Sequence, residues 1–329
     1  MKKFISLLCL AAFSISAGAA TLTVYTYDSF TSDWGPGPKV KTAFESVCNC
    51  ELKLVGLEDG VSLLNRLKIE GSNSEADIVL GIDTNLTAEA RATGLFTPHG
   101  ITAANLTVPN GWSDADFLPY DFGYFAFVYN KDIVANPPTS LKQLIEDEDG
   151  PTILIQDPRT STPGLGLLLW IKSVYGDDAA SAWHKLQPRI VTVTKGWSEA
   201  YGMFLKNEAP LVLSYTTSPA YHAIAEEDDR FAAADFEEGH YMQIEVAGIL
   251  KSSKQKELAK QFMSFMLGTD FQNIIPTNNW MYPAALTANS LPEVFKTLVD
   301  PAPVHLMTDE EVSANRKQWV DEWLEAMSQ

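Results

Sequence analysis

Strand-like and helix-like segments alternate along the first quarter of the chain. Residues 21–27 are β-branched and aromatic throughout, and residues 51–57 and 76–81 are two further strand candidates. Between them, residues 40–47 and 60–70 carry apolar side chains at helical spacing. Alternation of this kind is typical of a parallel sheet that is covered by helices. We therefore expect an α/β fold.

Two long strand candidates in the middle of the chain, residues 122–129 and 241–250, bracket a second α/β stretch. A chain of 329 residues also exceeds what a single hydrophobic core usually serves. We therefore expect two lobes, each interrupted by the other, with strands as the crossing segments. The predicted first lobe comprises residues 20–120 and about 247–285, and the second comprises about 121–246 and about 286–329, which include a C-terminal helical segment.

The N-terminus has the three parts of a secretory signal. Lys2 and Lys3 provide positive charge, residues 4–15 are an apolar run, and residues 17–19 read Ala-Gly-Ala, a small-residue cleavage pattern. The run is shorter than the roughly 20 residues that a membrane-spanning helix needs. We predict a signal peptide at residues 1–19 and a mature protein exported to the periplasm.

The chain is strongly acidic, with 24 Lys and Arg against 42 Asp and Glu and a formal net charge of −18. Nucleic acids and anionic membranes require an excess of basic residues, so we expect neither as a partner. A cationic or polar small ligand is compatible with this charge. No long heptad pattern indicates assembly, and we expect a monomer.

Only two cysteines, Cys48 and Cys50, remain after removal of the signal peptide. In an oxidising compartment this pair either closes a small disulfide ring or stays as two thiols, and the sequence leaves both alternatives open. Neither a second cysteine pair nor a histidine cluster accompanies them, so we expect no zinc site.

Motifs for catalysis and cofactor binding are incomplete or missing. The chain has no phosphate-binding loop, and Gly164-Leu165-Gly166 lacks the later glycine of a dinucleotide fingerprint. The five histidines are scattered, without the spacing of a catalytic zinc site. Gly111-Trp112-Ser113 and Gly196-Trp197-Ser198 lack the closing glycine of a nucleophile elbow. We therefore expect no enzyme, no catalytic residue, no metal and no cofactor.

Polar loops follow several strand candidates, where open α/β sheets place their ligands. Residues 58–60 and 157–164 are two such loops, and the second leads into a Leu-rich helix. Ser161 or Thr162 can cap this helix, and the N–H groups beyond carry partial positive charge that suits a phosphate oxygen. The same residues also fit an ordinary helix cap.

Aromatic residues also gather in the predicted loops and at strand ends. An aromatic face attracts a cation by roughly 0.5 to 2 kcal/mol, most where water is excluded. A flat cationic ring with a phosphate or hydroxyl tail would suit these residues and the helix cap, although packing inside a lobe is the alternative for each aromatic. The candidates are Tyr27, Trp34, Trp197, Tyr215, Tyr221 and Trp280.

Several long motifs resemble the bacterial periplasmic thiamine-binding proteins, and the resemblance covers nearly the whole mature chain. The resemblance implies a two-lobed periplasmic binding protein fold with the ligand cleft between the lobes. It also implies that thiamine and its monophosphate and diphosphate are transported ligands, and that an inner-membrane ABC permease is the partner. The motifs lie at residues 22–30, 33–38, 58–67, 156–170, 191–201, 211–221 and 279–283.

Carried over by position, the resemblance assigns ligand-binding roles to residues of both predicted lobes. The Asp59 carboxylate would meet the ring amino group or the positive charge of thiamine, with Tyr27, Tyr221 and Trp280 as enclosing aromatics. Ser161 and Thr162 would hold a phosphate. The remaining assigned residues are Gly60, Trp197, Tyr215, Thr216, Thr217 and Ser218, of which residues 215–218 would offer hydroxyl donors to the tail.

Three competing functions remain open at the level of sequence. A ferric-ion site would want paired tyrosines, and Tyr215 has no tyrosine neighbour. A polyamine site would want several carboxylates, and only Asp28, Glu58 and Asp59 qualify by position. A secreted hydrolase acting on thiamine phosphates would need a nucleophile with a base, or a metal. The sequence does not rank thiamine against its phosphates.

Overall fold

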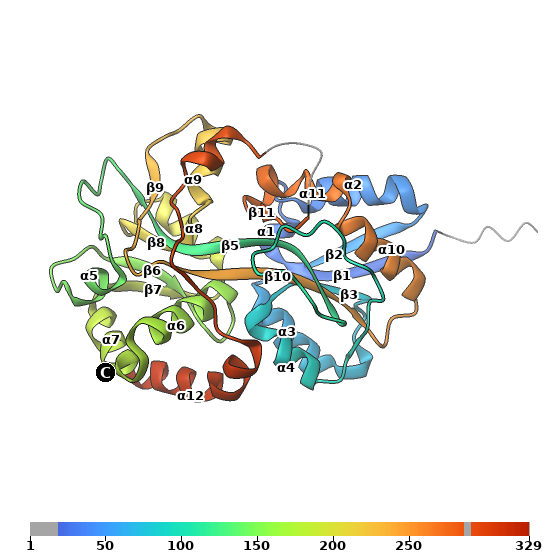
Figure 1. Cartoon of the computed structure of the whole chain (residues 1–329), viewed down its shortest axis with the longest axis horizontal. Helices are drawn as coiled ribbons and strands as arrows, with labels where there is room; N and C mark the ends of the chain where they lie inside the picture. The colour runs from blue at the N-terminus through green and yellow to red at the C-terminus, as the bar shows by residue number, and fades with distance from the viewer. Residues whose placement is uncertain (1–18, 286–290, 329) are drawn as a thin grey trace, which may run out of the picture.

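The computed structural model describes residues 19–285 and 291–328. The predicted signal peptide at residues 1–19 therefore lies almost wholly outside the described residues. Two α/β lobes lie side by side, and long strands run from one into the other (Figure 1). No described helix is long and apolar enough to cross a membrane.

The first lobe is built on the parallel strands that the N-terminal alternation predicts. β1 (Thr21–Tyr27) pairs in parallel with both β2 (Glu51–Leu57) and β3 (Ile78–Asp83). The connecting helices α2 (Gly37–Cys48) and α3 (Gly60–Glu70) bury their apolar faces in the lobe's core. Parallel strands need such covering helices on both faces, and the expected α/β fold is confirmed.

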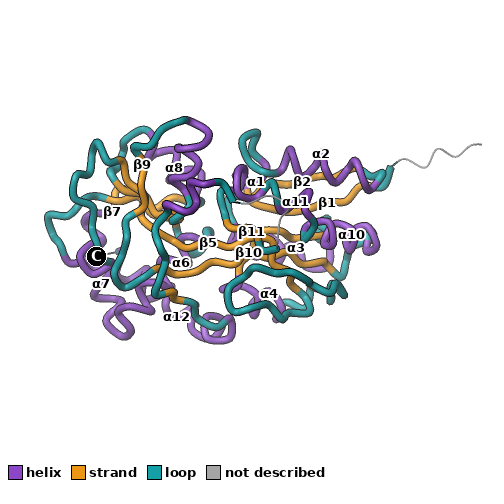
Figure 2. Tube along the Cα trace, turned by 45° about the horizontal axis from the view of Figure 1, so that its top comes forward, coloured by secondary structure: helices purple, strands orange, loops and turns teal. Residues whose placement is uncertain are grey.

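Two long strands connect the lobes. β5 (Phe117–Asn130) and β10 (His240–Leu250) pair antiparallel with each other. At the first lobe, β10 also pairs with β3, whereas β5 continues into the second lobe and pairs with β8 (Leu211–Tyr215). Strand order β2-β1-β3-β10-β5-β8-β6-β7 therefore runs through the whole molecule, and orange strands cross its middle in Figure 2. Residues midway along β5 and β10 are thus held at the junction of the lobes.

The second lobe repeats the α/β pattern of the first. β6 (Ile153–Gln156) pairs in parallel with β7 (Ile190–Thr194) and with β8. The Leu-rich α6 (Thr162–Tyr175) is buried along its first ten residues, because it passes beneath the sheet and against β10. The other helices of this lobe are α5 (Leu141–Glu146), α7 (Ala179–Leu186) and α8 (Trp197–Leu205).

Shorter elements complete the chain. The C-terminal helix α12 (Asp309–Met327) packs against α7 of the second lobe and also against α4 (Thr87–Ala92) of the first. The predicted lobe boundaries, which place this helix in the second lobe, remain a prediction. The remaining elements are α1 (Asp28–Thr31), β4 (Phe96–Thr97), α9 (Ser218–Tyr221), β9 (Phe231–Ala233), α10 (Lys256–Met266), α11 (Thr269–Gln272), β11 (Tyr282–Pro283), β12 (Val304–His305) and π-helical turns at His222–Glu226 and Ile275–Asn279.

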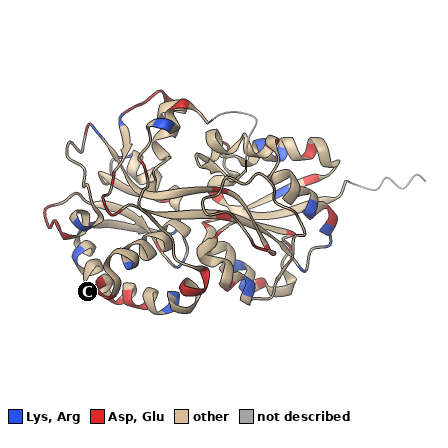
Figure 3. Ribbon diagram, in the orientation of Figure 1, with Lys and Arg blue, Asp and Glu red and all other residues tan. Residues whose placement is uncertain are grey.

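The end of α2 is fixed in two ways. Cys48 and Cys50 form a disulfide, which is one of the two alternatives that the sequence leaves open. Phe44 on the inner face of α2 packs edge-on against Phe262 of α10, with ring centroids 5.0 Å apart. Charged residues lie over the outer helices and loops of both lobes (Figure 3).

Candidate ligand-binding site

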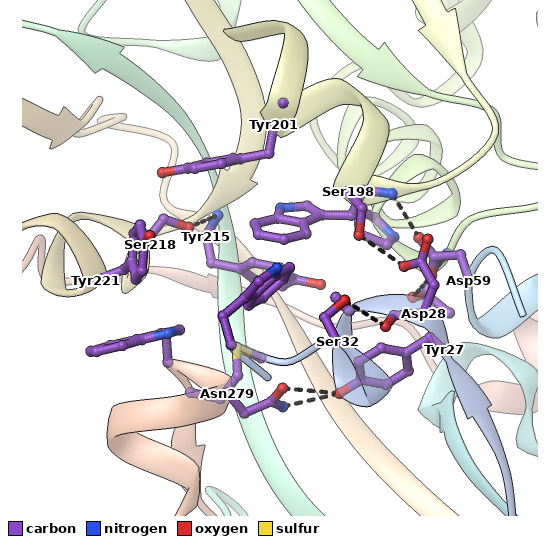
Figure 4. Close-up of a pocket in the computed structure, with 18 of the residues that line it drawn as sticks. Tyr27, Asp28, Ser32, Asp59, Ser198, Tyr201, Tyr215, Ser218, Tyr221 and Asn279 are labelled. Carbon is purple, nitrogen blue, oxygen red and sulfur yellow. Dashed lines mark hydrogen bonds between the residues drawn. The ribbon is translucent and has the colours of Figure 1, made fainter. Parts of the chain in front are cut away.

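A cavity of about 390 Å³ lies between the two lobes. It is enclosed by the ends of β1, β2 and β8 and by the N-terminal turns of α6 and α8, which is where an open α/β sheet is expected to hold a ligand. Seven of its 22 lining residues are aromatic, and they surround its centre (Figure 4). The aromatic lining residues are Tyr27, Trp34, Trp197, Tyr201, Tyr215, Tyr221 and Trp280.

Aromatic side chains from both lobes form the walls. Trp197 stacks on Tyr201, with ring centroids 4.7 Å apart, and its Nε1 donates to Ser214 Oγ at 2.8 Å. Trp34 of the first lobe faces Trp197 of the second, with ring centroids 6.2 Å apart, and is 48% exposed. The stack and the hydrogen bond hold the Trp197 ring in a fixed orientation, and the half-exposed Trp34 lies at the edge of the cavity.

A buried histidine supports this wall from behind. The Tyr201 hydroxyl lies 2.9 Å from His222 Nε2, and His222 Nδ1 lies 2.6 Å from Glu226 Oε2. Burial lowers the pKa of His222, although Glu226 opposes that shift. The His222 ring also stacks on Tyr201 and Phe231, so these residues form a continuous aromatic column behind Trp197.

The Asp59 carboxylate joins the two lobes at one end of the cavity. Its Oδ1 accepts hydrogen bonds from Gly60 N at 2.7 Å, Thr162 N at 3.2 Å and Thr162 Oγ1 at 2.9 Å. Its Oδ2 accepts from Ser161 Oγ at 2.8 Å and from Trp197 N at 3.1 Å. Helices α3, α6 and α8 thus direct their N-termini at one buried carboxylate, an arrangement that suits negative charge. Burial raises the pKa of Asp59 above its usual value, although these hydrogen bonds oppose that shift.

Further hydrogen bonds across the cleft hold the lobes together. Asp28 Oδ1 accepts from Ser198 Oγ at 2.8 Å (Figure 4). On the neighbouring surface, Ser62 N donates to Thr160 O at 2.9 Å. The structure therefore shows the lobes in contact around the cavity.

Nine of the thirteen predicted site residues line the cavity. They are Tyr27, Trp34, Asp59, Thr162, Trp197, Tyr215, Ser218, Tyr221 and Trp280. Of these, Asp59 accepts hydrogen bonds from protein groups of both lobes. Its predicted contact with a ligand remains a prediction.

The other four predicted residues lie behind the lining. Ser161 donates to Asp59, and a Cβ on Gly60 would meet Gly81 O and the Thr162 side chain, so both positions serve the close approach of the lobes. Thr216 and Thr217 are fully buried, and Thr217 Oγ1 lies 3.9 Å from Met281 Sδ. The Thr217 hydroxyl thus contacts a lining residue, whereas Thr216 Oγ1 has no hydrogen-bond partner among the described residues. The contact predicted for both with a ligand tail remains a prediction.

The predicted set of thirteen omits several lining residues, among them Asp28 and Glu58, which the sequence offered only as carboxylates for a polyamine site. Tyr201 lies one helical turn after Trp197, and Asp28 follows Tyr27 directly, so motif neighbours offered a signal for both. Glu245 is the one Asp, Glu, Lys or Arg residue of the mostly apolar strand β10, which was a weaker signal of a special role. The remaining lining residues are Ser29, Ser32, Glu58, Pro163, Ser198, Gly202, Leu205, Asn278, Asn279 and Met281.

Three buried carboxyl groups lie side by side across the sheet at the base of the cavity. Glu245 on β10 is in register with Asp83 on β3 and with Asp121 on β5. Burial raises the pKa of Glu245 and of Asp83 to about 7, and that of Asp121 well above its usual range. The described residues contain no group of three His, Cys, Asp or Glu side chains arranged to hold a metal ion.

Comparison with known proteins places this geometry in a family. The profile described as "Bacterial extracellular solute-binding protein" matches residues 36–273. The chain belongs to this family of solute-binding proteins. Members bind solutes rather than transform them, so this solute-binding protein is not an enzyme, and the expected periplasmic location is confirmed.

Relatives of this solute-binding protein extend over its full length. It is 58% identical over 328 residues to the thiamine-binding periplasmic protein of Escherichia coli, covering 100% of this chain and 99% of that one. It is 46% identical over 284 residues to the protein of the same name from Haemophilus influenzae, covering 85% of each. The resemblance proposed from the sequence motifs is thereby confirmed.

Solved structures share the two-lobed fold. A periplasmic thiamin binding protein superposes with a TM-score of 0.93 at 59% identity, covering 95% of this chain and 98% of that one. Iron-bound HitA from Pseudomonas aeruginosa superposes with a TM-score of 0.76 at 17% identity, covering 93% and 99%. At that identity the second likeness shows the fold alone.

Proposed function

We propose that this protein captures thiamine and its monophosphate and diphosphate in the cavity between the lobes and delivers them to an inner-membrane ABC permease. The observation that carries the proposal is the aromatic cavity between the lobes, with Trp197 and Tyr215 on its surface. The high identity to thiamine-binding relatives along the whole chain supports the same ligand. Family membership supports a role in import.

The aromatic walls suit the two rings of thiamine. The thiazolium ring carries a fixed positive charge, which aromatic faces stabilise by roughly 0.5 to 2 kcal/mol each, most where water is excluded. Trp197 is held in place by its stack on Tyr201 and by its hydrogen bond to Ser214, so little side-chain entropy is lost when a ring packs against it. Tyr221 and Trp280 lie edge to face, with centroids 5.4 Å apart, and extend this surface.

The helix N-termini around Asp59 suit the phosphate tail. N–H and hydroxyl groups of α6 and α8 converge there, and Thr162 lines the cavity. The Asp59 carboxylate accepts hydrogen bonds from these donors, so a phosphoryl group would compete with it or require it to move. We expect phosphorylated thiamine to bind with a local rearrangement of Asp59 and Ser161.

Calorimetric titration of the mature protein, stripped of ligand by unfolding and refolding, tests the proposal. The titrants are thiamine, its two phosphates, ferric citrate and spermidine, and the diphosphate sample is assayed for released phosphate. Saturable binding of thiamine compounds without phosphate release is the expected result. Binding of iron or spermidine in place of thiamine would overturn the ligand, and phosphate release would point to hydrolysis.

A further inference from the structure

Two buried carboxyl groups meet on the strands that connect the lobes. Glu245 on β10 lies directly opposite Asp121 on β5, and their side chains are 5% and 0% exposed. Glu245 lines the cavity, whereas Asp121 lies behind it. Neither residue belongs to the predicted binding motifs, so the pair needs an explanation of its own.

The hydrogen bonds around the pair come from neutral groups. The Tyr27 hydroxyl donates to Glu245 Oε2 at 2.9 Å, and Asn279 Nδ2 donates to Asp121 Oδ2 at 2.6 Å. The Tyr120 hydroxyl donates to that of Tyr27 at 3.2 Å, which extends the network. Within the described part of the chain, Asp121 Oδ1 has no hydrogen-bond donor and neither carboxyl group forms an ion pair with a lysine or arginine.

The other titratable groups that face Glu245 are all acids, so none of them brings a positive charge. Tyr27, Tyr120 and Tyr215 contribute phenols, from β1, β5 and β8 respectively. The carboxyl groups of Asp83 on β3 and Asp59 before α3 complete the set. Nearby carboxylates cannot all be ionised in a buried site without a compensating cation.

Some of these crowded, buried carboxyl groups must therefore be protonated. Burial and the neighbouring Glu245 raise the pKa of Asp121 well above its usual range, which favours its neutral form, and this form can donate to Glu245. Burial raises the pKa of Glu245 itself to about 7. Near neutral pH, Glu245 thus carries a proton part of the time, and it is the member of the pair that a ligand can reach.

We propose that Glu245, paired with Asp121, selects a positively charged ligand, and that the entering cation displaces the proton of Glu245 into solvent. This inference rests on the proposed function, because the thiazolium ring supplies the cation. The O–H bond of the Glu245 carboxyl group breaks, its proton passes to water or buffer, and the fixed charge of the ligand takes its place. A neutral ligand of the same shape cannot make this exchange.

The exchange has a defined dependence on pH. Below about pH 7 the empty site holds the proton of Glu245, so binding must expel it and the affinity for a cation rises with pH. Well above that pH Glu245 is already ionised, so proton release ends and the affinity levels off. A neutral analogue follows the opposite trend, because it binds best while Glu245 is protonated.

Calorimetry in buffers of different ionisation enthalpy counts the protons released on binding. The titrants are thiamine and a neutral analogue in which a thiophene ring replaces the thiazolium. Wild type, Glu245→Gln and the exposed-site control Glu257→Gln on α10 are compared below and well above pH 7. For wild type and the control we expect up to one proton released per thiamine at the lower pH and none at the higher.

Glu245→Gln should release no proton and should lose at least about tenfold of the preference for thiamine over the neutral analogue. Thiamine binding by wild type without proton release, or an unchanged preference in the variant, would overturn the inference and leave the proposed function intact. The wild-type proton count decides the matter even where Glu245→Gln does not fold. Failure of wild type to bind thiamine would remove the proposed function itself.

Discussion

The backbone N–H of Trp197, at the start of α8 in the second lobe, donates to Oδ2 of Asp59, which precedes α3 in the first lobe, at 3.1 Å. The same carboxylate accepts from Ser161 and Thr162 at the start of α6. One side chain thus gathers donors from two helices of the opposite lobe. Closure of the lobes and the geometry of the site therefore depend on each other.

Removal of the Asp59 carboxylate should weaken the closed arrangement. In Asp59→Ala the N–H of Trp197 and the hydroxyl of Ser161 lose their acceptor, and each unsatisfied buried donor costs about 1 to 3 kcal/mol. We expect the affinity for thiamine and both phosphates to fall at least about tenfold, because these bonds hold together the two lobes that enclose the cavity. Titration calorimetry measures the affinities. Asp59→Asn keeps one oxygen acceptor and should lose less affinity. Equal losses of affinity in the two variants would contradict the role of Asp59 in holding the lobes together.

Two variants should distinguish residues that contact the rings of thiamine from residues that contact its phosphate tail. Trp197→Ala removes an aromatic wall, so thiamine and its two phosphates should weaken alike, by about 1 to 3 kcal/mol. Ser161→Ala removes one of the donors to Asp59 that a phosphoryl group would also use, so it should weaken the phosphorylated forms more than thiamine. Calorimetric titration of each variant with all three compounds gives the comparison. The reverse pattern would remove these two assignments.

Gly81 holds Tyr27 in position beside Glu245. Its φ of +109° disfavours other residues, and an added Cβ would contact the Tyr27 ring. Gly81→Ala should therefore lower both stability and thiamine affinity, since Tyr27 lines the cavity. Gly71→Ala is the matched control, because φ is +56° there and an added Cβ meets no atom within 4 Å.

Both glycine variants should lose about 1 kcal/mol or more of unfolding free energy from backbone strain. Only Gly81→Ala should lose ligand affinity in calorimetric titration. Equal affinities in the two variants would show that the Tyr27 position does not matter for binding.

The sequence predicted the parts of this structure that local pattern determines. The β-branched residues 21–27 form β1, and the capping residues of 157–164 begin α6, because strand propensity and helix capping act over a few residues. The aromatic lining was predicted because Trp197, at the start of α8, and Tyr215, at the end of β8, lie in recognisable motifs.

The missed features depend on the register between distant strands. Glu245 and Asp121 are 124 positions apart and meet only because β10 and β5 pair antiparallel, which no local pattern reveals. The sequence also did not reveal that Asp59 links the lobes, since its donors Ser161 and Trp197 come from the other lobe. Long-range packing, rather than residue type, decides which polar groups satisfy one another.

The buried Asp83 should make the stability of the empty protein depend on pH. Burial raises its pKa to about 7, whereas an unfolded aspartate has a pKa of about 3.9. Between these values the folded protein binds more protons than the unfolded chain. The free energy of unfolding therefore falls as pH rises through this window, and Glu245 acts in the same direction.

Replacement of Asp83 by Asn should flatten this dependence. The asparagine oxygen can still accept from Asn85 N, and the group no longer titrates, so the fall in unfolding free energy from about pH 4 to pH 7 should lessen by up to about 1.4 kcal/mol per pH unit. Urea denaturation at a series of pH values measures the slope. Asp228, a partly exposed residue whose pKa Arg230 lowers to about 2, provides the control, because Asp228→Asn should leave the slope in this window unchanged. Equal slopes in wild type and Asp83→Asn would show that Asp83 is ionised throughout, which would require a cation to compensate it inside the fold.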